Sequence, residues 1–120
     1  MNLRLSRSLA VAFLIGFIFL TSAIAERYEG HVGKLKAVFK IEWGGDKSVG
    51  GTYWYPSRKG VVYTLDGEFG ADGKLILREY TGGKLTAVLT LSDAGRGGKI
   101  RWSGKMKNTD GREFEVSFGD

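Results

Sequence analysis

The residues that could carry out chemistry are few in this chain of 120 residues. His31 is the single histidine, and there is no cysteine. Disulfides, thiolate zinc sites and cysteine nucleophiles are therefore excluded. No serine lies in a Gly-x-Ser-x-Gly elbow, and no glycine-rich phosphate loop precedes a helix. His31 and Glu79 remain the one pair that acid–base catalysis could use, so we expect a protein that is not an enzyme and has no cofactor.

Glu79 is the one carboxylate that shares the apolar phase of its segment, two residues after Leu77. A buried carboxylate needs hydrogen-bond partners, and Arg101 or tyrosine hydroxyls could supply them. Glu79 is thus either part of a structural ion pair or the anchor for a ligand's amine or hydroxyl group. Residues 68–73 with Glu79 have the spacing of a calcium loop, but Gly70 stands where an oxygen ligand belongs. We expect a hairpin turn there and no metal site.

Aromatic side chains are concentrated on one face of the predicted strands. In a small barrel they either fill the interior or line a ligand cavity. A short chain without disulfides needs its apolar volume for stability, which favours a filled interior. If a cavity exists, its predicted polar-tipped walls, together with Glu79 as anchor, are Tyr53, Tyr55, Tyr63 and Trp102.

Trp54 lies on the opposite, outward face of its strand, between Tyr53 and Tyr55. A large ring facing water is costly unless something covers it. The ring either packs against the N-terminal segment 28–31 or Val62, or it forms, with Tyr55 and Arg58, a contact surface for a partner.

The elements that must position these residues are β-strands, because apolar residues alternate with polar ones along most of the chain. In residues 35–43, for example, Leu35, Phe39 and Trp43 share one face, and Lys36 and Lys40 share the other. Six further segments alternate in the same way, and a shorter one at residues 28–32 makes eight. Short Gly, Asn and Asp clusters separate them, as tight hairpins require. The sequence predicts an all-β antiparallel meander of seven or eight strands, closed into an up-and-down barrel or left as a strongly curled sheet or small sandwich.

The first 25 residues have the layout of a secretory signal peptide. Arg4 and Arg7 precede an apolar run at residues 9–20, and an Ala-x-Ala pattern ends at Ala25. The run is short for a membrane span, so we expect cleavage after Ala25 and a single domain at residues 26–120. Removing the two arginines lowers the formal net charge from +5 to about +3. Basic and acidic residues are interleaved in that domain, and with export this argues against a nucleic-acid partner.

A pattern running from Gly51-x-Tyr53-x-Tyr55 through Leu65-x-Gly67 and Leu75-x-Leu77-x-Glu79 to Ile100-x-Trp102-x-Gly104 covers most of this domain. It resembles small exported bacterial proteins of uncharacterised function. The overall plan also resembles the calycin-like barrels, which include lipocalins and avidins. That resemblance is one of fold and implies no binding residues.

We therefore expect a periplasmic or extracellular protein that acts by binding. The first hypothesis is recognition of an envelope protein or glycan through the surface around Trp54 and Arg58, with the membrane met only transiently through the signal peptide. The alternative is a carrier of a small apolar ligand inside the barrel. A cavity of about 300 Å³ or more would favour the carrier.

Overall fold

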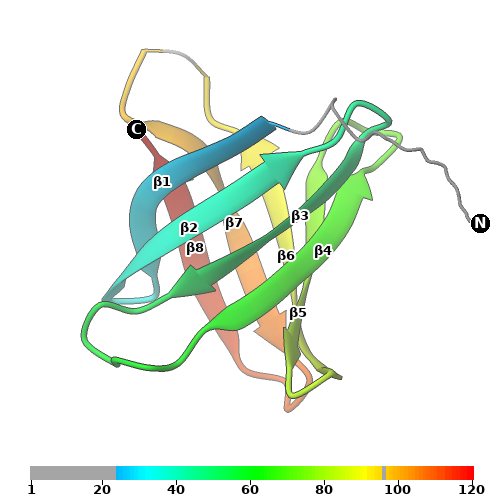
Figure 1. The fold of residues 1–120 in the computed structure, drawn as a ribbon. Coiled ribbons are helices and arrows are strands. Elements are labelled where there is room, and N and C mark those ends of the chain that lie inside the picture. The colour runs from blue at the N-terminus through cyan, green and yellow to red at the C-terminus, as the bar shows by residue number, and fades with distance from the viewer. Residues whose placement is uncertain (1–23, 96) are drawn as a thin grey trace, which may run out of the picture.

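The computed structural model describes residues 24–95 and 97–120, which form a closed barrel of antiparallel strands (Figure 1). Each strand pairs with the next along the chain, and β1 pairs with β8 to close the ring. The predicted up-and-down barrel is confirmed. In chain order the strands are β1 (Ile24–Val32), β2 (Leu35–Trp43), β3 (Ser48–Trp54), β4 (Tyr63–Phe69), β5 (Leu75–Thr81), β6 (Lys84–Asp93), β7 (Ile100–Asn108) and β8 (Glu113–Gly119).

The predicted signal peptide falls almost wholly outside the described residues. Of its 25 residues the structure describes Ile24 and Ala25, which begin β1 and pair with Trp43 and Glu42 of β2. None of the residues from 24 onward that the structure describes forms a helix able to cross a membrane.

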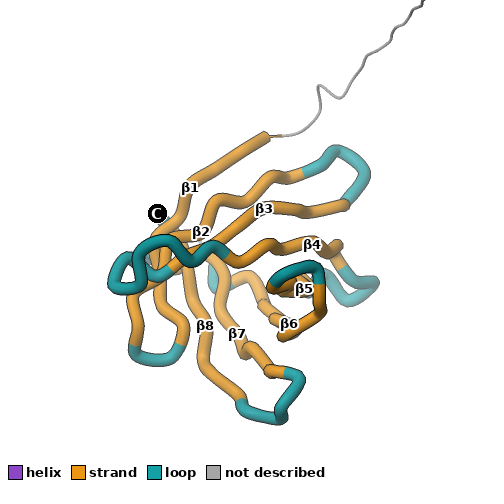
Figure 2. The backbone as a smooth tube through the Cα atoms, turned by 60° about the horizontal axis from the view of Figure 1, so that its bottom comes forward, coloured by secondary structure: helices purple, strands orange, loops and turns teal. Residues whose placement is uncertain are grey.

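The two ends of the barrel differ, and the direction of each strand fixes which residues reach which end. The β1–β2, β3–β4, β5–β6 and β7–β8 connections lie together at the lower end in Figure 1, which we call the mouth. The other three connections and the C-terminus lie at the opposite end, which we call the closed end. Figure 2 turns the mouth toward the viewer and shows the strands arranged around the barrel axis.

The core fills the middle of the barrel and its closed end. Phe39, Phe118, Leu77 and Leu89 are fully buried in one cluster of inward-facing side chains. At the closed end Trp43 stacks on Phe69 with ring centroids 5.8 Å apart, and Trp102 lies 5.8 to 6.1 Å from both. Aromatic packing therefore fills this end of the barrel. The filled interior that we expected from the sequence is present here.

Glycines on the inward phase allow neighbouring strands to approach closely. At Gly67 in β4, an ideal Cβ atom would lie 1.8 Å from the carbonyl oxygen of Ile76 in β5. At Gly104 in β7, the same atom would lie 2.0 Å from the carbonyl oxygen of Thr90 in β6. Glycine is the residue that permits such tight coiling, which a small barrel needs in order to close.

The segment that resembles a calcium loop is the β4–β5 hairpin, as predicted. The amide of Gly73 donates to the carbonyl of Gly70 at 3.0 Å, and the amide of Lys74 donates to Asp72 Oδ1 at 3.0 Å. Glu79 lies toward the other end of β5, near the mouth. The turn and Glu79 therefore do not share a site.

Two apolar residues do not follow the predicted alternation. Alternation along residues 61–69 would put Val61 on the inward face with Tyr63, but β4 begins at Tyr63 and Val61 lies in the preceding loop with 40% of its surface exposed. Alternation along residues 85–91 would likewise turn Leu85 inward with Ala87, yet Leu85 is also 40% exposed. A register shift between Glu79 and Tyr80 opposite it reverses the orientation at this point, because a bulge changes which face each residue occupies.

Candidate functional site

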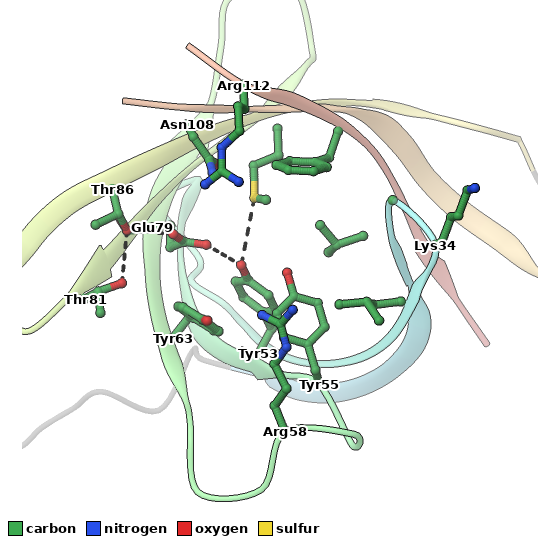
Figure 3. Close-up of a pocket in the computed structure, with 15 residues that line it drawn as sticks. Lys34, Tyr53, Tyr55, Arg58, Tyr63, Glu79, Thr81, Thr86, Asn108 and Arg112 are labelled. Atoms are coloured by element: carbon green, nitrogen blue, oxygen red, sulfur yellow. Dashed lines mark hydrogen bonds between the residues drawn. The ribbon is translucent and has the colours of Figure 1, made fainter. Parts of the chain in front are cut away.

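A cavity of about 410 Å³ opens at the mouth of the barrel (Figure 3). It exceeds the volume of about 300 Å³ at which small-molecule pockets begin. The expected filled interior is thus correct for the closed end and the middle, and wrong at the mouth. The polar residues that line the cavity are Lys34, Tyr53, Tyr55, Arg58, Tyr63, Glu79, Thr81, Thr86, Asn108 and Arg112.

A buried carboxylate lies at one side of the cavity. Glu79 is 5% exposed, and its Oε1 atom accepts a hydrogen bond from the hydroxyl of Tyr53. Its Oε2 atom accepts from Thr86 Oγ1 at 2.6 Å. Burial, and then the hydrogen bond to Glu79, raise the pKa of Tyr53 well above its usual value. The carboxylate therefore joins strands β3, β5 and β6 through hydrogen bonds to neutral hydroxyl groups.

The bulge in the β5–β6 pair explains why Thr86 reaches Glu79. Tyr80 pairs with Leu85 and Glu79 pairs with Ala87, so Thr86 is the extra residue between them. Its hydroxyl contacts both Glu79 Oε2 and Thr81 Oγ1, the latter at 3.0 Å. Strict alternation would have placed Leu85 inside, whereas the bulge brings a hydroxyl to the buried carboxylate and satisfies it.

Three tyrosines form an aromatic wall on the β3–β4 side of the cavity. Tyr53 and Tyr63 stack with ring centroids 4.9 Å apart and an interplanar angle of 19°. Tyr55 meets both rings edge to face, at 5.6 and 5.8 Å. Burial raises the pKa of the Tyr55 hydroxyl. The wall presents ring faces and protonated hydroxyls, which suit a ligand that is apolar in its body and polar at its edges.

Three cations surround the opening, on three separate connections (Figure 3). The Arg58 guanidinium lies over the Tyr55 ring at 5.3 Å, and that of Arg112 lies over the Phe114 ring at 5.8 Å. Arg112 also pairs with Asp110. Within residues 24–95 and 97–120, neither Arg58 nor Lys34 forms an ion pair. The opening therefore carries positive charge that no neighbouring carboxylate neutralises.

One buried acceptor in the cavity wall has no donor. Asn108 Oδ1, at the end of β7, is inaccessible to solvent and is the one buried side-chain polar atom of the described chain without a hydrogen-bond partner. Buried polar atoms are nearly always satisfied, so each exception calls for an explanation. Other atoms of this half-buried side chain line the cavity, where a ligand can contact them.

The predicted ligand-binding residues separate into two groups. Tyr53, Tyr55, Tyr63 and Glu79 all line the cavity, while Trp102 lies in the aromatic plug of the closed end. Strand direction accounts for this difference. β7 starts at the closed end and Trp102 is its third residue, whereas the other four lie where β3, β4 and β5 reach the mouth.

The predicted partner-surface residues lie side by side at a second depression. Trp54 and Arg58 line a groove of about 430 Å³ on the outside of the β3–β4 loop, together with Tyr55, Lys59 and the two valines Val61 and Val62. Trp54 is half-buried, and the Arg27 guanidinium lies 5.8 Å from its ring. The residue of β1 that lies over the outward ring is thus Arg27, which precedes the segment 28–31 of the first alternative.

His31 and Glu79 are not brought together. His31 is exposed on β1, where it lies opposite Lys36 and Ser117 in the ladders, and it does not line the cavity that holds Glu79. Arg101, considered as a partner for Glu79, instead pairs with Asp120 at the closed end, at 3.5 Å. Glu79 obtains its hydrogen bonds from Tyr53, as one of the two expectations stated, and from Thr86.

Sequence reasoning missed five polar cavity residues, Lys34, Thr81, Thr86, Asn108 and Arg112. All of them except Thr86 lie in or beside hairpin turns, which we interpreted as solvated connections. The predicted meander could have indicated these residues, because every second turn of an up-and-down barrel lies at the same end and its residues can line one opening. Only the bulge that turns Thr86 inward had no signature in the sequence.

No family model, curated protein or solved structure matches the chain. The site is therefore interpreted from its own geometry. It combines an aromatic wall, a satisfied buried carboxylate, an acceptor without a donor and unpaired cations at the opening. Such an arrangement can bind a small organic anion.

Proposed function

We propose that this protein is an exported, non-catalytic binding protein that holds a small organic anion with an apolar body in the mouth of its barrel. The observation that carries the proposal is the lining of the mouth cavity, which combines the tyrosine wall, the Asn108 side chain and the cations Arg58 and Lys34 at the opening. Each of these features corresponds to one part of such a ligand. The apolar part would lie against the rings, a polar group would contact the Asn108 side chain, and the negative charge would face the opening.

The polarity of the cavity refines the carrier expected from the sequence. A purely apolar ligand would take polar and charged groups of the lining out of water without giving them hydrogen-bond partners, which is unfavourable. An anion gains charge-assisted hydrogen bonds from the guanidinium groups instead. The small volume also favours a compact molecule over a long chain.

A matched pair of fluorescent probes tests this proposal. 8-Anilino-1-naphthalenesulfonate has the same two aromatic groups as N-phenyl-1-naphthylamine and adds one sulfonate. We expect the folded protein to bind one equivalent of the anion, and to bind it about tenfold more tightly than the neutral probe, since hydrogen bonds to a charged group are worth about 1.5–3 kcal/mol. Equal affinity for the two probes would contradict a site built for anions.

The variant Arg58→Gln locates the charge recognition. It removes the guanidinium that lies over Tyr55 at the opening, so it should weaken binding of the sulfonate probe about tenfold and leave the neutral probe within about twofold. Arg101→Gln at the closed end changes the net charge by the same amount and is the control. If the control variant weakens sulfonate binding as much as Arg58→Gln does, the mouth is not where the anion is recognised.

Export is the second part of the proposal, and the residues at the start of the barrel are compatible with it. Cleavage after Ala25 would remove two pairs of the β1–β2 ladder and no core residue. Glu26, the new first residue, accepts hydrogen bonds from Tyr28 Oη at 2.5 Å and Trp43 Nε1 at 2.9 Å. We expect mass spectrometry of the protein recovered from producing cells to show a chain that starts at Glu26. A mature chain that still contains residues 1–25 would contradict the signal peptide.

Recognition of an envelope protein or glycan through Trp54 and Arg58 stays a prediction. The mouth cavity has the more specific chemistry, because it combines a buried unsatisfied acceptor with charge and aromatic faces. The groove beside Trp54 lies next to the mouth and belongs to the outer surface of the barrel.

A further inference from the structure

Exposed apolar side chains gather at the mouth of the barrel. Five large hydrophobic residues of the described chain are exposed, and three of them are at this end: Val61 at 40%, Val62 at 56% and Leu85 at 40%. Val61 and Val62 project from the β3–β4 loop, and Leu85 is the second residue of β6, after the β5–β6 turn. Val61 and Leu85 are the two residues at which the structure departs from the alternation in the sequence, and all three side chains lie outside the barrel core.

Positive charge accompanies these side chains. The mouth connections carry Lys34, Arg58, Lys59 and Arg112 against the single acid Asp110, which already pairs with Arg112. Lys59 precedes the two valines by two or three residues, and Lys84 precedes Leu85 directly, while Glu113 begins β8 at the same end. The closed end is nearer to neutral, because the sequence of its turns and C-terminus sets Lys47, Lys74, Arg96 and Lys99 against Asp46, Asp72 and Asp120.

We infer that the mouth docks on an anionic lipid surface, and that its contact surface, the docking rim, consists of Val61, Val62, Leu85, Arg58, Lys59 and Lys84. Exposed apolar residues flanked by lysine and arginine are the arrangement that enters a lipid headgroup region while its cations meet acidic lipids. The groove of about 430 Å³ beside Trp54 continues this surface, since Lys59, Val61 and Val62 line it. An aromatic ring of this kind is favoured at a membrane interface.

The charge decides in favour of a lipid surface over a second copy of the chain. Two mouths facing each other would bring like charges together without a neutralising partner. From the sequence we expected the protein to contact a membrane only transiently, through its signal peptide. The docking rim would instead let the folded barrel bind a membrane. Docking would bring the opening of the cavity against the membrane. An amphiphilic ligand could then pass between the membrane and the cavity.

Vesicle sedimentation tests the inference without using the cavity. We expect the processed protein to bind phosphatidylcholine vesicles that contain phosphatidylglycerol at least about tenfold more tightly than vesicles of phosphatidylcholine alone. Salt at about 1 M, which shortens the screening length to about 3 Å, should remove most of the difference. Equal binding to the two kinds of vesicle, or binding to neither, would overturn the inference, and capture of a protein by the rim would then be the alternative to pursue.

Paired variants locate the contact. Lys59→Glu with Lys84→Glu should weaken binding to the anionic vesicles about tenfold or more, and Val61→Ser with Val62→Ser should weaken it as well. Lys74→Glu with Lys99→Glu makes the same change of net charge at the closed end and should bind nearly as the unaltered protein does. All variants have the same N-terminus, so any contribution from it cancels. Equal losses at the two ends would overturn the inference.

These rim residues do not line the mouth cavity, with the exception of Arg58, which the variants leave unchanged. Binding of the sulfonate probe should therefore persist in every variant, and an unchanged urea unfolding midpoint shows that each one is folded. The vesicle experiments can therefore contradict the docking rim without contradicting the ligand cavity, and the probe experiments can do the reverse.

Discussion

Replacing Gly67 with alanine should lower the free energy of unfolding by about 3 kcal/mol or more. The added Cβ would lie 1.8 Å from the carbonyl oxygen of Ile76 and 3.0 Å from the Cα atom of Leu77. Both are backbone atoms, so no flexible side chain can move aside. Strand β4 would have to separate from β5 where Gly67 pairs with Leu77. Small domains are stable by about 5–15 kcal/mol, so this loss is a large share of the total.

Gly50→Ala is the matched control, since the atom nearest to its new Cβ, the carbonyl oxygen of Leu65, is 3.8 Å away. We expect that variant to stay within about 1 kcal/mol of the original protein. Urea unfolding followed by tryptophan fluorescence measures both variants. Absence of a folded state in Gly67→Ala agrees with the account, whereas an unfolding midpoint equal to that of Gly50→Ala would show that the close approach of β4 and β5 is not needed.

Alkaline pH should destabilise the barrel steeply. Burial raises the pKa of Tyr28 to about 12 and also raises the pKa values of Tyr53 and Tyr55. In the unfolded chain all three ionise near pH 10. Above about pH 10 the unfolded state therefore binds fewer protons than the folded state, and stability falls as pH rises. A tyrosine that stays protonated in the folded protein contributes at most about 1.4 kcal/mol per pH unit, and Tyr53, the most deeply buried of the three hydroxyls, comes nearest to that limit.

Urea unfolding at a series of pH values from about 9 to 12 measures this slope. The contribution of the tyrosines is fully present below about pH 10 and is lost toward pH 12 and above. Tyr53→Phe removes the group with the largest pKa shift and should reduce the slope more than Tyr28→Phe or Tyr55→Phe does, apart from a constant cost for the hydrogen bond to Glu79. A stability that does not change between about pH 10 and 12 would show that these hydroxyls are accessible to water in the folded protein.

The alternation of side chains predicted most of the fold because each strand has one face inside the barrel. Phe39, Leu77 and Phe118 are buried as their phase requires, and so is Glu79, the one carboxylate on that phase. The short glycine-rich connections predicted antiparallel neighbours, and the ladder that joins β1 to β8 closes the ring. Closure itself was one of several alternatives, since a period of two does not distinguish a barrel from a curled sheet or a sandwich.

Two features of the site were beyond that periodicity. The bulge that brings Thr86 to Glu79 depends on the register between β5 and β6, which the side-chain pattern of either strand alone does not determine. The cavity depends on how far each inward side chain extends along the barrel axis. Trp102 has the predicted inward phase, yet it packs against Trp43 and Phe69 far from the tyrosine wall.

The division between a plugged end and an open end reconciles stability with binding. Aromatic packing among Trp43, Phe69 and Trp102 completes the core at the closed end, and Tyr28 donates to Glu26 beside it. At the mouth, Glu79 of β5 accepts hydrogen bonds from Tyr53 of β3 and Thr86 of β6. These bonds hold the Tyr53 side chain in place and join the three strands. A chain without disulfides thus combines a filled closed end and middle with a hollow mouth.

The location of a bound anion is the most direct test of this account. We would titrate the isotope-labelled protein with 8-anilino-1-naphthalenesulfonate and follow the NMR chemical shifts of its backbone amide and tryptophan indole N–H groups. We predict that the largest shifts occur at Arg58, Thr86 and Asn108 around the mouth cavity, and that the indole signals of Trp43 and Trp102 at the closed end change little. Shifts centred on the Trp54 indole and the outer groove, with the mouth amides unchanged, would contradict a ligand site inside the barrel.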